Sequence, residues 1–144
     1  MILSGASSLR AIAAPFAAAR RGVPVVALSL LAACAEPDLS DPRTRSLMAM
    51  PAPLHYAERR VAREMAGQCP GYTYDEKLAE AISQARLKAG AQAALEVRGA
   101  TDLEADIKRR SLTARYGGVY DPCTILNGEL AAQTPLSVLV KRRG

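Results

Sequence analysis

The sequence predicts a small all-α domain, a bundle of about four helices closed by one disulfide. Three observations lead to this fold class. Apolar residues after position 53 recur at intervals of three or four, which is the period of an amphipathic helix. Glycine, proline and short polar residues separate these segments where helices start and end. Two cysteines lie far apart in the same region, and a domain with a small core often needs a disulfide for stability.

The first two helices are delimited by clear signals. Residues 54–69 carry one apolar stripe at helical spacing, and Pro70-Gly71 ends that helix. Thr73 and Glu76 then match a T-x-x-E capping box, whose hydroxyl and carboxylate satisfy free backbone donors at the start of a helix. Gly90 either ends this second helix or only weakens it.

Two further helices complete the predicted bundle. Thr101 and Glu104 repeat the capping box and open a helix that reaches about Tyr116. The residues expected on its inward face are Leu103, Ile107 and Ala114. Asp121-Pro122 opens the last helix, because aspartate suits the N-cap and proline the first helical position. The apolar run 136–140 could form a strand, but no second strand is apparent to pair with it.

The first 33 residues have the order of a secretory signal peptide. They carry three arginines and no acidic residue, and a short apolar run follows Arg21. This run is shorter than the ~20 residues that a transmembrane helix needs. We therefore expect residues 1–33 to be removed. The remaining 16 basic and 14 acidic residues give a net charge of +2 instead of +5, so a nucleic-acid partner, which needs a basic stripe, is not expected.

The end of the apolar run resembles the lipobox of bacterial lipoproteins. Its residues are Leu31-Ala32-Ala33-Cys34, a leucine, two small residues and a cysteine. The resemblance implies cleavage before Cys34, a diacylglycerol on its thiol and a further acyl chain, such as palmitate, on its amine. It also implies a membrane anchor in the bacterial cell envelope facing the periplasm, and Ala35 favours the outer over the inner membrane. An organelle transit peptide has a similar composition but does not need this motif.

Residues 34–52 are predicted to be the lipidated cysteine and a flexible tether, because three prolines interrupt any helical period there. The 18 residues that follow the cysteine reach at most ~60 Å when extended. The small helical domain is then expected at residues 53–144.

Cys69 and Cys123 are predicted to form a structural disulfide. Export places them in an oxidising compartment, where a single remaining pair usually joins. A metal or redox site fits less well, because the two cysteines are 54 positions apart, form no C-x-x-C motif and have only one distant histidine as a companion. No metal and no cofactor are expected.

The surroundings of these cysteines carry a second resemblance. The order Cys69-Pro70-Gly71-Tyr72, then Tyr120-x-Pro122-Cys123 and a closing Leu-Val run is similar to small exported helical proteins of bacteria without an assigned function. The similarity covers residues 60–143 and implies no chemistry.

Few residues suggest a functional site. Tyr72, Tyr74 and Tyr120 each lie within five residues of a cysteine, so the disulfide would gather them at one end of the bundle. Tyrosine is favoured at protein interfaces, although these side chains could instead cover the disulfide. His55, the only histidine, is expected to be solvated or to cap a helix. The basic runs 108–110 and 141–143 suit helix C-termini, and could also meet anionic lipid headgroups.

Together these observations favour a membrane-anchored envelope lipoprotein that acts as a non-enzymatic structural or partner-binding module. Its expected partners are the lipid bilayer, through Cys34, and an unidentified envelope protein. The alternative is a small enzyme or ligand carrier that uses the bundle interior, with His55 or a tyrosine as its polar group. This alternative predicts a concave pocket with perturbed titrating groups.

Overall fold

The computed structural model describes residues 37–144, so the predicted signal peptide and Cys34 lie outside the described residues. In chain order the elements are α1 (Pro42–Ala49), α2 (Ala52–Gln68), β1 (Tyr72–Tyr74), α3 (Glu76–Lys88), α4 (Arg98–Arg115), α5 (Pro122–Ala131), the 3-10 helix η1 (Pro135–Leu139) and β2 (Val140–Arg142). The predicted helical fold with one disulfide is confirmed. The described residues form five α-helices and a short two-stranded sheet, where about four helices and no sheet were expected.

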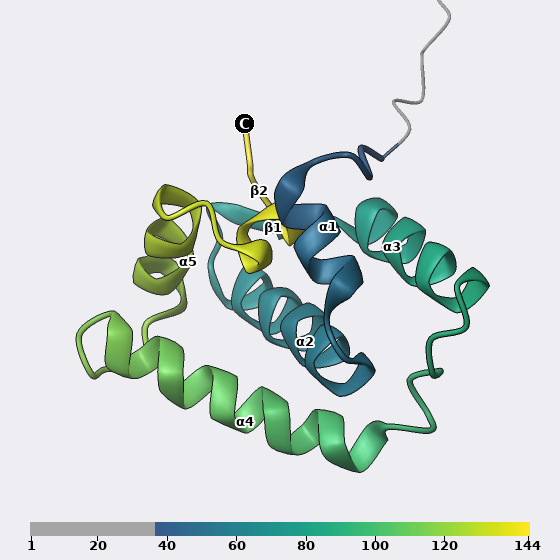
Figure 1. Cartoon of the computed structure of the whole chain (residues 1–144). Coiled ribbons are helices and arrows are strands. Elements are labelled where there is room, and N and C mark those ends of the chain that lie inside the picture. The colour runs from purple at the N-terminus through teal and green to yellow at the C-terminus, as the bar shows by residue number, and fades with distance from the viewer. Residues whose placement is uncertain (1–36) are drawn as a thin grey trace, which may run out of the picture. The chain divides into compact units, whose positions relative to one another are not determined.

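Helix α2 is the centre of the fold, with the other helices arranged around it (Figure 1). Its buried positions include Ala57, Val61 and Met65, which recur at the predicted helical period. Several buried positions of α2 are alanines, which lets neighbouring helices approach closely. The core also takes leucine and isoleucine side chains from α1, α3, α5 and η1.

The structure corrects the predicted tether, because residues 42–52 belong to the folded domain. Asp41 is the N-cap of α1, and its carboxylate accepts a hydrogen bond of 2.7 Å from the Arg43 amide. Pro42 occupies the first helical turn, where its missing N–H costs nothing. Leu47 is 0% exposed and joins the core. Only residues 35–41 therefore separate Cys34 from α1.

Both predicted capping boxes are wrong. Thr73 lies in β1, and the N-cap of α3 is Asp75, whose carboxylate accepts from the Leu78 amide at 3.2 Å. Thr101 lies inside α4, which begins three residues earlier, at Arg98. In contrast, the predicted N-cap at Asp121 is confirmed, because this side chain accepts from the Cys123 amide at 3.0 Å.

The predicted inward face of α4 is also wrong. Leu103 is 58% and Ile107 47% exposed, and Ala114 is exposed as well. The buried residues of α4 are instead Thr101, Ala105 and Leu112. The contact of α4 with α2 therefore depends on small side chains more than on a leucine stripe.

Two strands that lie far apart in the sequence pair with each other. β1 and β2 are antiparallel, with Tyr72 opposite Arg142 and Tyr74 opposite Val140. The apolar run that was a candidate strand is mainly the 3-10 helix η1, and only its last residue enters β2. The partner strand went unrecognised because it is only three residues long and lies far away in the sequence.

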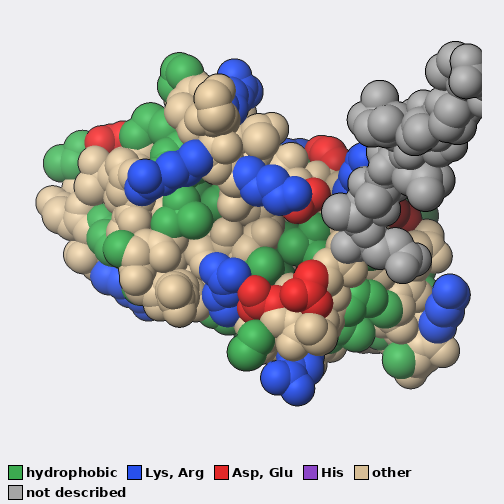
Figure 2. Space-filling model, turned by 90° about the horizontal axis from the view of Figure 1, so that it is seen from above, with side chains coloured by type: hydrophobic (Ala, Val, Ile, Leu, Met, Phe, Trp, Pro, Cys, Tyr) green, Lys and Arg blue, Asp and Glu red, His purple; other side chains and the backbone are tan. Residues whose placement is uncertain are grey.

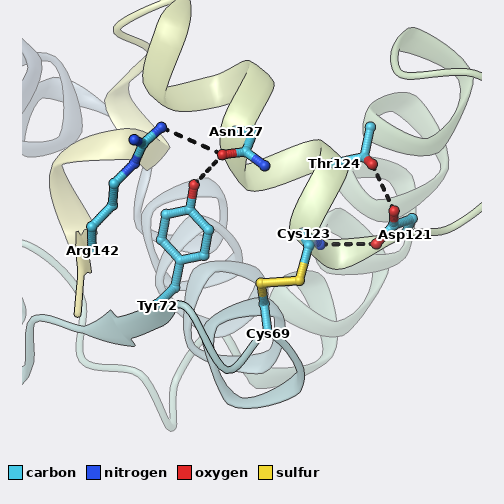
Figure 3. The surroundings of a disulfide bond; sticks show 7 residues. All are labelled: Cys69, Tyr72, Asp121, Cys123, Thr124, Asn127 and Arg142. Atoms are coloured by element: carbon cyan, nitrogen blue, oxygen red, sulfur yellow. Dashed lines mark hydrogen bonds between the residues drawn. A yellow bond between two sulfur atoms is a disulfide. The ribbon is translucent and has the colours of Figure 1, made fainter. Parts of the chain in front are cut away.

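The predicted disulfide is present. Cys69 follows the last residue of α2 and Cys123 lies in the first turn of α5, with a Cα–Cα distance of 5.3 Å (Figure 3). The bond thus joins the central helix to α5. Among residues 37–144, no helix is both long and apolar enough to cross a membrane.

Candidate functional site

The three candidate tyrosines have different surroundings. Tyr72 is buried near the disulfide and donates a hydrogen bond to Asn127, which also accepts one from Arg142 at 3.4 Å (Figure 3). Tyr74 is half-buried, and its ring lies under the guanidinium of Arg63, 4.9 Å from the centroid. Tyr120 is 37% exposed. Tyr72 therefore covers the disulfide end of the fold, while Tyr74 belongs to a separate surface.

That surface is a groove beside α2, which we call the arginine–tyrosine groove. Its volume is about 470 Å³. The lining residues are Tyr56, Arg59, Arg60, Arg63, Glu64, Tyr74 and Ala94. A second hollow of about 410 Å³ continues it and shares three of these residues. Its additional residues are Leu95, Arg98, Thr101 and Asp102.

Helical periodicity explains how the groove forms. Tyr56, Arg60 and Arg63 follow one another at steps of four and three along α2, so they share a helix face that the core does not use. Gly90 has a φ of +85°, which glycine adopts without strain, and it turns the chain out of α3. The connection that follows, residues 91–97, contributes Ala94 to the groove, and Ala94 with Leu95 to the second hollow.

The groove carries more positive than negative charge. Arg60 forms an ion pair with Asp102, and Arg63 forms one with Glu76. Arg59 instead donates to the hydroxyl of Ser83 and, at 3.3 Å, to the hydroxyl of Tyr74. Within residues 37–144, neither Arg59 nor Arg98 has a carboxylate partner. The groove thus presents guanidinium groups next to tyrosine rings, an arrangement suited to carboxylates and other planar anions.

His55 contradicts the expectation that it is solvated or capping. Its side chain is 0% exposed in the first turns of α2, and neither ring nitrogen has a hydrogen-bond partner in the described residues. Burial, followed by the positive charges of Arg86 and Arg59, lowers its pKa to about 4. The sequence did contain a signal, because His55 lies on the same helical stripe as Met65 and Cys69. His55 lines neither of the two hollows.

Two buried carboxylates form a network that the sequence did not reveal. Glu129 is 0% exposed and accepts hydrogen bonds from Arg115 at 3.1 Å, Tyr116 at 2.8 Å and Thr134 at 2.6 Å. Glu58 accepts from Lys108 at 2.6 Å, and its second oxygen has no partner in the described residues. Burial raises the pKa of the Glu58 carboxyl. The network links α2, α4 and α5, so its first role is to hold these helices together.

No group of three or more histidine, cysteine, aspartate or glutamate side chains in residues 37–144 has a metal-binding arrangement. Comparisons with protein-family models, with curated proteins and with solved structures each returned no match for this chain.

Proposed function

We propose that this chain is a lipid-anchored protein of the bacterial cell envelope that acts as a non-enzymatic, partner-binding module. One observation carries the proposal. Cys69 and Cys123 form a disulfide, so Cys34 is the one cysteine of the sequence that this bond does not use. Disulfides persist in oxidising compartments, and Cys34 follows a sequence that resembles a lipobox. Both features favour export, anchoring of the mature chain through Cys34 and a domain that faces the periplasm.

The arginine–tyrosine groove is the proposed partner-binding surface. Arginine binds carboxylates through paired N–H donors, and tyrosine adds rigid apolar area. Leu95, which is 85% exposed in the adjoining hollow, offers a further apolar contact. These properties suit an acidic segment of an envelope protein that also carries apolar side chains.

The buried ionisable groups support a structural role for the interior. Glu129 accepts three hydrogen bonds, and His55 is enclosed by packing around α2. Groups held in this way stabilise a fold. The alternative of an enzyme or ligand carrier would instead need them to face a cavity that a substrate can reach.

The anchor is tested by intact mass and by membrane fractionation. The protein purified from a bacterial host should start at Cys34, carry the mass of acyl chains and gain two hydrogens on reduction. It should float with membranes, whereas Cys34→Ser should be recovered without acyl chains. An unprocessed chain with three free thiols would overturn the proposal.

The groove is tested with a fluorescent glutamate-rich peptide and the acylated protein in detergent. Arg63→Glu in the groove and Arg98→Glu in the adjoining hollow should each weaken binding about tenfold, since each replaces an attraction with a repulsion. Arg110→Glu is the matched control, because Arg110 lies on α4 but does not line the groove. If all three variants bind as the parent protein does, the groove is not the binding surface.

A further inference from the structure

The short connection between Cys34 and α1 limits where the domain can be. Seven residues, 35–41, lie between Cys34 and α1. Fully extended they span roughly 25 Å, and as a coil about 15 Å. Leu47 fixes α1 in the core, so the helix cannot unwind without loss of packing. A chain anchored at Cys34 therefore keeps its folded domain beside the bilayer.

One face of the domain lies beside the described part of this connection. Pro37 and Asp38, the first described residues, line a hollow of about 500 Å³ together with residues from the other end of the chain, including Lys141 and Arg142. The start of the described chain and its C-terminus lie on the same side of the domain (Figure 1). Seen from that side, Lys and Arg side chains are spread over the surface (Figure 2).

We call this surface the basic end. The basic residues that line its hollow are Arg43, Lys77, Lys141 and Arg142, and the acidic ones are Asp38, Asp41 and Asp75. We include Arg143, the next residue along the chain.

Two of the carboxylates on the basic end are already neutralised. Asp41 pairs with Arg43 at 2.7 Å, and Asp75 pairs with Lys141. Asp38 accepts hydrogen bonds from Ser40. In the described residues no carboxylate pairs with Lys77, Arg142 or Arg143. Positive charge thus remains available on the side of the domain where the described chain begins.

We infer that the basic end is the surface that the anchored domain places on phospholipid headgroups, with anionic phospholipid as its ligand. The inference rests on the lipid anchor proposed above. The anchor supplies the affinity for the membrane, and the unpaired basic side chains orient the domain. Each cation near an anionic membrane surface lowers the free energy of the orientation that places it there. Helix α4 lies on the side of the fold away from the C-terminus (Figure 1), so Arg98 and Asp102 stay accessible to a periplasmic partner.

The reactivity of the lysines provides a test that needs no substitution in the protein. The four lysines after Cys34 are Lys77, Lys88, Lys108 and Lys141. The acylated protein is reacted with an amine reagent in detergent, in phosphatidylcholine vesicles, and in vesicles that also contain phosphatidylglycerol. Mass spectrometry of peptides gives the rate at each lysine. In the phosphatidylglycerol vesicles Lys77 and Lys141 should react about fivefold more slowly than in detergent, while the exposed Lys88 keeps its rate.

Charge reversal distinguishes orientation from anchoring. Lys77→Glu with Arg143→Glu should abolish the protection of Lys141 without changing flotation, since neither side chain has an ion pair in the described residues. Lys88→Glu with Arg110→Glu, the matched control, should leave the protection intact. If the protein floats but Lys141 reacts at the detergent rate, the orientation is wrong and the anchor stands. If it does not float, both proposals fail.

Discussion

At the scale of single residues, His55 makes the stability of the domain depend on pH. The pKa of its imidazole is about 4 in the folded chain and about 6.5 in an unfolded chain. At a pH between these two pKa values, the imidazole is protonated in the unfolded state and neutral in the folded state. The contribution of His55 to the free energy of unfolding is therefore fully present above about pH 6.5. As the pH falls toward 4, the free energy of unfolding decreases by up to roughly 3 kcal/mol.

We predict that His55→Leu flattens this pH dependence. Leucine has a similar volume and no titrating group, so the free energy of unfolding should change less between pH 7 and pH 4.5 than in the parent protein. Urea denaturation at the two pH values measures the difference. Glu58 acts in the opposite sense, because its raised pKa favours the folded state at low pH, and the comparison between variants cancels its effect.

Asp41→Asn is the control for this pH series. Hydrogen bonds from Arg43 lower the pKa of Asp41 to about 2. Its contribution is present above the unfolded pKa of 3.8 and disappears as the pH falls toward 2, mostly below the window of His55. A parent-like slope in His55→Leu would show that the imidazole is not buried in its neutral form.

At the scale of elements, α1 shows how a local signal can be overlooked. Asp41-Pro42 is the same N-cap and first-turn pair as Asp121-Pro122, which correctly marks the start of α5. The prolines around α1 suggested a tether, although Pro42 begins the helix and Pro51 lies between two helices. The distinction depends on the burial of Leu47, which is a tertiary contact.

We therefore predict that Leu47→Ala destabilises the domain. Truncation of a fully buried leucine costs about 2–5 kcal/mol, and Leu47 is 0% exposed. Ser46→Ala, at the exposed neighbouring position, should change the free energy of unfolding much less. Chemical denaturation of both variants measures the contrast. Equal stability of the two variants would mean that residues 42–49 form a tether after all.

Helix α4 illustrates a different reason for a wrong prediction. Its existence followed from the sequence, but its buried face did not. That face contains Thr101, Ala105 and Leu112, and beside it Lys108 forms a salt bridge with Glu58 of α2. Hydrophobic periodicity cannot identify a face made of small residues and ion pairs. The two large apolar residues that it selected, Leu103 and Ile107, are on the exposed side.

At the scale of the whole molecule, features with local causes could be predicted from the sequence and features with distant partners could not. The helical class, the end of α2 near Cys69 and the N-cap at Asp121 have local signals. The pairing of β1 with β2, the carboxylate network and the arginine–tyrosine groove join segments far apart in the chain. The groove was partly anticipated, since Tyr74 was a candidate but the arginines of α2 were not.

The disulfide is the distant contact that the sequence did predict, and it encloses much of the domain. Residues 70–122, between the two cysteines, contain β1, α3 and α4. Closing a loop of 54 residues removes unfolded-state entropy equivalent to about 4 kcal/mol. That is a large part of the 5–15 kcal/mol typical of small domains, so we predict that reduction leaves the domain marginally stable.

The measurement is urea denaturation of the oxidised protein, the reduced protein and Cys69→Ala with Cys123→Ala. The reduced protein and the double variant should both unfold at much lower urea than the oxidised protein, because each lacks the same constraint on the unfolded chain. The double variant should respond no further to reductant. Equal midpoints in the oxidised and reduced protein would show that packing around α2 alone holds the fold, and that the oxidising compartment is not needed for its stability.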